Sequence, residues 1–198
     1  MGRVRGIIFD MDGTLIVQEL DFAAMRREIG LPPDTPLLEA LTAMSEAERA
    51  AANEVLLRHE RIAARTARVN PGVVAFLDCL DRLAVRRGLF SRNSREAVES
   101  VLNRCALRFD AVVARENAPF KPNPEGLWQI CEAWQLAPAE VLMVGDYLYD
   151  IQAGRNAGMR TALVTHGRKW FFAGQADLVF PSFEEIPDVL RGWIAAGG

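Results

Sequence analysis

Cysteine is scarce in this sequence: Cys79, Cys105 and Cys131 are the three among 198 residues. Their odd number, wide spacing and apolar, helical surroundings argue against a disulfide framework and against a thiolate metal site. We therefore expect buried free thiols, which suit the reducing environment of the cytoplasm.

Long hydrophobic runs are also absent. No apolar stretch reaches the roughly 20 residues that a membrane-spanning helix needs, and Asp10 interrupts the one near the N-terminus. No signal peptide is recognisable. The sequence therefore predicts a cytoplasmic protein that has no membrane partner.

An excess of positive charge is lacking as well. Lys and Arg number 23, Asp and Glu number 26, and the formal net charge is -3. A mildly acidic chain is a poor match for nucleic acid, so we expect no nucleic-acid partner. The chain is rich in apolar side chains, and half of its residues are hydrophobic. That content suffices for a well-buried core in one domain, or in one domain with an insert.

Short apolar runs alternate with helical patterns along most of the chain. This alternation is typical of a parallel sheet with helices on both faces, so we predict an α/β, Rossmann-like fold. Strands are expected at residues 4–9, 88–90, 111–113, 141–144, 161–164 and 178–180. Helices are expected at about residues 71–83, 94–105, 123–134 and 149–157, with a terminal helix after 182–185.

Residues 20–68 break the alternation because they read as helical throughout. We interpret residues 16–70 as a small all-helical cap domain, inserted after the first strand of a core domain formed by residues 1–15 and 71–198. Ser45 and Glu48 form a capping box that should begin a long helix. Asn70 is expected to cap the next helix with Pro71 at its first position, and residues 182–185 repeat the capping-box pattern.

Two carboxylates, Asp10 and Asp12, directly follow the first expected strand in the hexapeptide Asp-Met-Asp-Gly-Thr-Leu. Unpaired carboxylates are costly to bury, so a pair at the mouth of a core strand indicates a metal, a reacting group, or both. The alternative is a turn whose aspartate caps a helix. Gly13 permits a sharp turn under either interpretation.

Polar residues also follow three other expected strands. They are Ser91, Arg92 and Asn93 after 88–90, Lys121 in the loop after 111–113, and Asp146 and Asp150 after 141–144. Each has a plainer interpretation: a strand end, a solvated lysine, or carboxylates at a helix start. Sites in open parallel sheets form outside the carboxyl ends of the strands. Four such groups in one chain therefore favour a shared site.

The order of these motifs resembles the haloacid dehalogenase-like hydrolase superfamily, specifically its phosphatases with a helical cap after the first motif. The resemblance runs from Ile7 to about Ala162. It implies a Mg2+-dependent phosphatase that hydrolyses a small phosphomonoester through an aspartyl-phosphate on Asp10. Hard oxygen ligands suit Mg2+, and a cation and a lysine are needed to bring two anions together.

The resemblance also assigns roles to individual residues. Asp10 would be the nucleophile, and Asp12 would protonate the leaving oxygen and later activate water. Asp10, Asp146 and the main-chain carbonyl of Asp12 would hold the metal, with Asp150 orienting the ligands or Lys121. Lys121 would pair with both nucleophile and phosphate. Ser91 would bind phosphoryl oxygens, and either Arg92 or Asn93 would face the ligand.

Alternatives remain at the level of function. Relatives that are dehalogenases or phosphonatases lack an acid at the position of Asp12, so Asp12 favours phosphoryl transfer. A phosphosugar mutase keeps that acid and stays possible, as does a non-catalytic binding module. The expected partner is a small phosphorylated metabolite, and the expected assembly is a monomer or a weak homodimer.

One further pattern lies in the expected cap. Arg58, Arg61, Arg65 and Arg68 share one helical face. A solvated face is the favoured interpretation, because charge runs on helices are usually of that kind. The alternative is a basic surface that meets a second anionic group of the substrate.

Overall fold

The computed structural model describes residues 3–17 and 20–195 as an α/β fold. Its strands are β1 (Gly6–Phe9), β2 (Arg86–Phe90), β3 (Ala111–Val113), β4 (Val141–Gly145), β5 (Arg160–Val164) and β6 (Leu178–Phe180). Its α helices are α1 (Phe22–Ile29), α2 (Leu37–Thr42), α3 (Glu46–Thr66), α4 (Val73–Arg82), α5 (Arg95–Arg104), α6 (Glu125–Trp134), α7 (Leu148–Asn156) and α8 (Asp188–Ala195).

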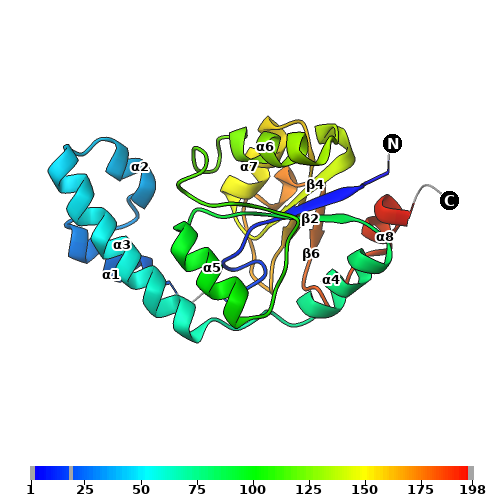
Figure 1. The fold of residues 1–198 in the computed structure, drawn as a ribbon, viewed down its shortest axis with the longest axis horizontal. Coiled ribbons are helices and arrows are strands. Elements are labelled where there is room, and N and C mark those ends of the chain that lie inside the picture. The colour runs from blue at the N-terminus through cyan, green and yellow to red at the C-terminus, as the bar shows by residue number, and fades with distance from the viewer. Residues whose placement is uncertain (1–2, 18–19, 196–198) are drawn as a thin grey trace.

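The strands form one parallel sheet in the order β3-β2-β1-β4-β5-β6. Because successive side chains of a strand point to opposite faces, each central strand contributes to two cores. Ile7 and Phe9 pack with α4, α5 and α8, whereas Ile8 packs with α6 and α7. Figure 1 shows these two helix layers on either side of the sheet. The predicted Rossmann-like α/β fold is confirmed.

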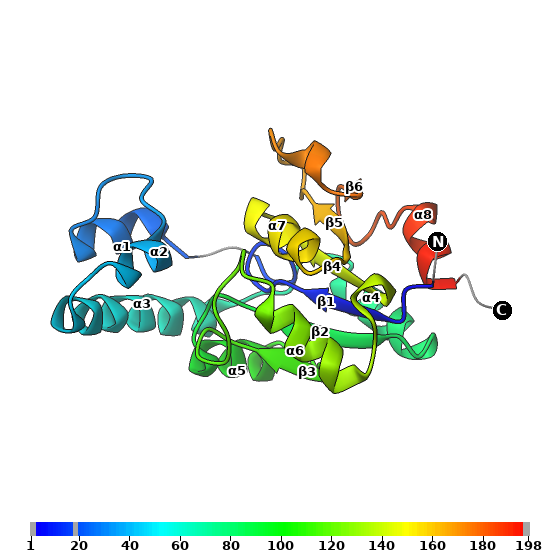
Figure 2. The ribbon, with the colours of Figure 1, turned by 90° about the horizontal axis from the view of Figure 1, so that it is seen from above.

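Helices α1, α2 and α3 lie together beyond the sheet (Figures 1 and 2). They enclose a small apolar cluster of their own, to which Met25, Leu38 and Leu56 belong. Where the chain leaves and re-enters the sheet region, its two segments run side by side: Ile16 forms an antiparallel bridge with Val69. The Val17 N–H also donates to the Arg68 carbonyl at 2.9 Å.

Helix α3 belongs to both parts of the molecule. Leu56, in its middle, packs in the small cluster, whereas Ala64, near its end, packs in the main core with α4 and α5. The helix begins at the predicted capping box, in which the Ser45 and Glu48 side chains each bind the other's backbone N–H. One continuous helix therefore connects the two hydrophobic clusters.

Two predicted helix starts are wrong. Helix α4 begins after Gly72, which adopts a left-handed conformation, and the Asn70 side chain instead donates to the Thr14 carbonyl at 2.9 Å. Asn70 thus holds the loop that follows β1. Residues 182–185 form a turn, in which the Glu185 N–H donates to the Ser182 carbonyl, and α8 begins only after Pro187. Proline favours a helix start because the first N–H groups of a helix have no intrahelical partner.

The remaining expectations from composition concern thiols and membranes. All three cysteines are free; Cys131 is buried, while Cys79 and Cys105 are only half-buried. Within residues 3–17 and 20–195, no helix combines the length and the apolar character that crossing a membrane requires.

The indole of Trp134 packs close to Gly6 of β1 and Gly88 of β2. A Cβ atom on Gly6 would lie 2.6 Å from the Trp134 ring. Because the ring is large and rigid, Gly6→Ala should lower the free energy of unfolding by about 1–3 kcal/mol, the usual cost of overpacking. Gly174→Ala is the matched control, since a Cβ there meets no atom within 4 Å. Urea unfolding of both variants checks this, and equal midpoints would contradict it.

Candidate active site

The strand register brings the predicted site residues to one edge of the sheet. Phe9 of β1 is paired with Val144 of β4 on one side and with Leu89 of β2 on the other. The residues that follow these strands are therefore neighbours, and the Asp10 N–H donates to the Val144 carbonyl at 2.9 Å. Asp10, Asp12, Ser91, Arg92, Asn93, Lys121, Asp146 and Asp150 all line a single cavity of about 440 Å³.

The loop after β1 is folded tightly against the loop after β4. Gly13 has a φ of +81°, and a Cβ atom on it would lie 2.3 Å from a carboxylate oxygen of Asp146. The Thr14 hydroxyl donates to the other Asp146 oxygen at 3.3 Å. Glycine is therefore required here both for the turn and for the approach of the two loops.

Lys121 is the centre of the ionic contacts. Its side chain is 1% exposed and forms ion pairs with Asp10 and, at 2.7 Å, with Asp150. The second oxygen of Asp150 accepts the Tyr147 N–H at 3.0 Å. Both oxygens of Asp150 are thus engaged by protein groups, which suits a residue that orients Lys121.

Three carboxylates in the cavity have the geometry of a cation site. Asp10, Asp146 and Asp150 each offer one oxygen, and these oxygens lie within 4.8 Å of one another. Hard, buried oxygen donors fit Mg2+. The prediction from sequence named Asp10, Asp146 and the main-chain carbonyl of Asp12. The observed carboxylate cluster shares Asp10 and Asp146 with that set and also includes Asp150. The Asp12 carboxylate is directed to the Asn93 amide at 2.6 Å.

Burial raises the pKa values of the acids in this site. For Asp10 burial outweighs the attraction of Lys121, and the pKa rises to about 6. Burial and the charge of Asp10 raise the pKa of Asp12 to about 7. Burial and the charges of Asp10 and Asp150 raise the pKa of Asp146 to about 8. Burial alone would lower the pKa of Lys121, but Asp10 and Asp150 raise it. The positive charges of Lys121 and of Arg168, which lies 3.8 Å from Asp146, do not offset the cost of burying these carboxylates, and a divalent cation would supply further positive charge.

Arg92 and Asn93 point in different directions. The Asn93 side chain faces Asp12, whereas the Arg92 guanidinium crosses the cavity to Glu39 of α2, with both oxygens 2.8 Å from Nη2. Arg92 also lies over the ring of Tyr149 at 4.5 Å. Ser91 is buried, and its hydroxyl oxygen accepts the Asn93 N–H at 3.1 Å. Asn93 is thus the residue of this pair that contacts a predicted catalytic side chain, whereas Arg92 donates to the main-chain carbonyl of Lys121 at 3.1 Å.

The arginines predicted to share one helical face lie outside the cavity, and the prediction is wrong for Arg68, because α3 ends at Thr66 and Arg68 follows it. Arg58, Arg61, Arg65 and Arg68 are exposed, and none of them lines the cavity. Arg58 is paired with Glu28, and Arg61 with Glu96 of α5. These positions favour the solvated-face interpretation.

The opposite face of α3 holds a residue that the sequence reasoning missed. Ala52, Leu56, Glu60 and Ala64 are its buried residues and recur every four positions. Glu60 lines the cavity and pairs with Arg115, a residue that was also missed. A charged residue within an apolar stripe is the signal that could have identified Glu60.

A family model for haloacid dehalogenase-like hydrolases matches residues 4–158, which include all of these site residues. This chain belongs to the haloacid dehalogenase-like hydrolases. The resemblance inferred from the motifs is therefore confirmed.

Relatives across the chain agree with this assignment. A haloacid dehalogenase-like hydrolase domain-containing protein of Arabidopsis thaliana is 35% identical over 174 residues, covering 82% of this chain and 71% of the relative. The N-acetylmuramic acid 6-phosphate phosphatase of Pseudomonas aeruginosa is 30% identical over 188 residues, covering 83% of each chain. A hydrolase of Pseudomonas syringae has the same fold, with a TM-score of 0.78 at 17% identity, over 90% of this chain and 94% of that one.

The raised pKa values make stability depend on pH in a defined direction. Between the ordinary aspartate pKa of 3.8 and about 8, the folded protein binds more protons at Asp10, Asp12 and Asp146 than the unfolded chain does. The contribution of these three groups to the free energy of unfolding therefore falls as the pH rises through this range. Asp146→Asn removes one of the charges. It should raise the Tm of EDTA-treated protein by about 3 °C or more at pH 8 and by clearly less at pH 5, where only the lower part of the range from 3.8 to about 8 has been crossed.

Addition of Mg2+ provides the complementary measurement. Mg2+ should raise the Tm of the unsubstituted protein at pH 8, because a ligand of the folded state stabilises it. It should raise the Tm of Asp146→Asn much less. Asp78→Asn, on the exposed face of α4, is the control and should behave like the unsubstituted protein in both tests. A Mg2+ response that survives in Asp146→Asn would place the cation elsewhere.

Proposed function

We propose that this chain is a Mg2+-dependent phosphatase that hydrolyses a small phosphomonoester through an aspartyl-phosphate on Asp10. The observation that carries the proposal is the pairing of Asp10 with the buried Lys121 in a cavity that also contains Asp12 and Asp146. In a haloacid dehalogenase-like hydrolase this set provides a nucleophile, an acid and the positive charge that phosphoryl transfer needs.

The first step forms a bond between an Asp10 oxygen and phosphorus and breaks the ester P–O bond. Asp12 donates its proton to the departing oxygen; a pKa of about 7 suits a group that must both give and accept a proton near neutral pH. In the second step Asp12 takes a proton from the water that hydrolyses the aspartyl-phosphate. Lys121 holds the Asp10 carboxylate and offsets its charge while the anionic phosphate approaches.

The site also needs groups that bind the metal, the lysine and the phosphate, and Asp10 serves in binding as well as in reaction. Asp10, Asp146 and the main-chain carbonyl of Asp12 would hold Mg2+, which supplies charge neutralisation to the phosphoryl group. Asp150 would keep Lys121 in place through its 2.7 Å ion pair. The buried Ser91 hydroxyl would donate to a phosphoryl oxygen.

Two properties support a small phosphorylated metabolite as substrate. The cavity of about 440 Å³ lies between the sheet edge and α1, α2 and α3, and it has both apolar and charged walls. The relative from Pseudomonas aeruginosa is named for a phosphorylated amino sugar acid. A binding module would not need the complete set of Asp10, Asp12, Lys121 and Asp146. A mutase would need it, so released phosphate must be measured directly.

The nucleophile is tested by Asp10→Asn, whose amide is nearly the same size but a poor nucleophile. Phosphate release from p-nitrophenyl phosphate with Mg2+ should fall at least about a thousandfold. Circular dichroism should remain unchanged. Asp78→Asn controls for loss of an aspartate elsewhere and should keep full activity. The mechanism would be refuted if Asp10→Asn kept most of the activity. The mutase would be favoured if the unsubstituted protein released no phosphate but transferred it between positions of a sugar.

The acid is tested by Asp12→Asn with two substrates. An alkyl phosphate such as β-glycerophosphate has a poor leaving group and needs the proton, whereas p-nitrophenolate leaves without it. Loss of general acid catalysis should slow the alkyl ester by about a hundredfold or more, and the aryl ester much less. Equal losses on the two esters would show that Asp12 serves the geometry of the site instead.

A further inference from the structure

Glu60 is a buried carboxylate on a helix of the predicted cap. Only 5% of the residue is exposed, and its neighbours along the same face of α3 are Leu56 and Ala64. Burying a carboxylate is costly unless it is paired and hydrogen-bonded. Within the described residues, Glu60 hydrogen-bonds to Ser94 and Arg115, which lie on the sheet side of the cavity. Its burial therefore serves the junction between α3 and the core rather than the packing of α1, α2 and α3.

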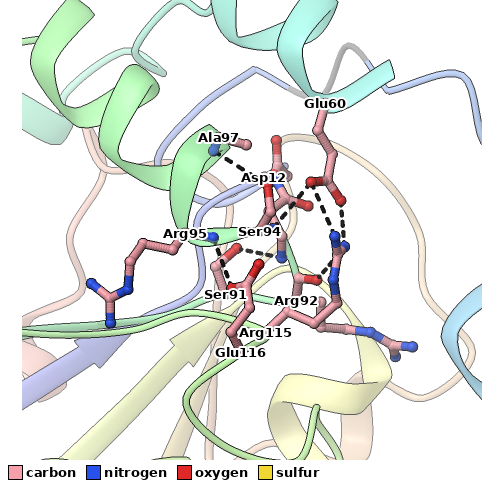
Figure 3. Close-up of polar contacts among 10 residues, drawn as sticks. Asp12, Glu60, Ser91, Arg92, Ser94, Arg95, Ala97, Arg115 and Glu116 are labelled. Atoms are coloured by element: carbon pink, nitrogen blue, oxygen red, sulfur yellow. Dashed lines mark hydrogen bonds and ion pairs between the residues drawn. The ribbon is translucent and has the colours of Figure 1, made fainter. Parts of the chain in front are cut away.

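Those partners form one connected network, drawn in Figure 3. One Glu60 oxygen accepts from Arg115 Nη1, and the other accepts the Ser94 N–H at 3.1 Å. Arg115 in turn binds the same loop: its Nη1 donates to the Arg92 carbonyl at 3.3 Å, and its backbone N–H donates to the Asn93 carbonyl at 2.9 Å. Glu60 and Arg115 together therefore hold the main chain of residues 92–94.

The loop that they hold contacts Asp12 directly. Asn93 lies at its centre, and its side-chain amide donates to an Asp12 oxygen at 2.6 Å. A continuous set of polar contacts thus runs from α3, through Arg115 and the 92–94 backbone, to Asp12. The position of the Asn93 amide depends on the backbone that Glu60 and Arg115 fix.

We infer that Glu60 is a positioning residue, which acts through Arg115 and residues 92–94 to hold the Asn93 amide and, through it, the Asp12 carboxylate. This inference rests on the proposed function, in which Asp12 transfers protons. Proton transfer requires the acid within hydrogen-bond reach of the leaving oxygen, so a displaced Asp12 loses that part of catalysis. Attack by Asp10, which Lys121 holds separately, remains.

The competing explanation is that Glu60 only attaches α3 to the core. The chain offers a matched control, because the next residue forms a similar pair. Arg61 donates to Glu96 of α5 at 2.7 and 2.8 Å, also joining α3 to the core. That pair is exposed, and in the described part of the chain its two side chains hydrogen-bond to each other rather than to residues 92–94. If attachment is the whole role, removing either pair should have comparable effects on catalysis.

The experiment compares Glu60→Gln with Glu96→Gln on β-glycerophosphate and p-nitrophenyl phosphate. We expect Glu60→Gln to lower kcat for the alkyl ester at least tenfold and for the aryl ester less than threefold. Asn93→Ala should reproduce this selectivity. Glu96→Gln should leave both rates within twofold. Equal losses on the two esters in Glu60→Gln, or the same selective loss in Glu96→Gln, would overturn the inference.

Two additions keep the test decisive. If Glu60→Gln does not fold, Glu60→Gln/Arg115→Gln replaces it, because the double variant leaves no buried charge unpaired. If the unsubstituted protein hydrolyses neither ester, the proposed function fails by itself, and the positioning claim is judged from the Asn93 side-chain amide in a ¹⁵N–¹H spectrum. That signal, identified by its loss in Asn93→Ala, should shift in the Glu60 variant and stay in place in Glu96→Gln. An unmoved signal in the Glu60 variant would refute the inference.

Discussion

The pairing of one buried lysine with two buried aspartates is the interaction around which this site is organised. Lys121 is almost fully enclosed and contacts both Asp10 and Asp150. The lysine offsets part of the charge that burial makes costly, yet the pKa values of Asp10 and Asp146 remain raised. Close backbone approach at Gly13 lets the loops that carry these acids meet. The resulting site is rich in negative charge, and this excess is the physical basis for proposing that a divalent cation takes part in its chemistry.

Much of this arrangement follows from the sequence because parallel strands end at a common edge. The apolar runs located the strands, and the residues after them, such as Asp10, Lys121 and Asp146, do line one cavity. The direction of individual side chains could not be predicted in the same way. Arg92 and Asn93 are adjacent, yet one reaches Glu39 and the other Asp12, because loop conformation after β2 is set by contacts from distant residues.

The errors have a common physical origin, since local patterns compete with tertiary contacts. Asparagine is a common helix cap, but the side chain of Asn70 donates a hydrogen bond to the Thr14 carbonyl instead. On α3 the arginines Arg58, Arg61 and Arg65 form a regular charged row, but they are exposed to solvent. The informative residue was Glu60, a lone acid on the apolar face, whose partners Ser94 and Arg115 are distant in sequence. A buried charge can be recognised from periodicity, but its partners cannot.

The continuity of α3 has a mechanical consequence. Its C-terminal part, from Glu60 onward, is fixed to the core, while its N-terminal part carries α1 and α2 over the cavity. A helix rises 1.5 Å per residue, so the arm from Glu60 back to Glu46 is roughly 21 Å long, and a tilt of about 10° at the fixed end would move its tip by about 4 Å. A rotation of α3 about Glu60 would therefore move α1 and α2 by several ångströms relative to Asp12, and the pair between Arg92 and Glu39, which joins α2 to the core, would have to yield or move with it.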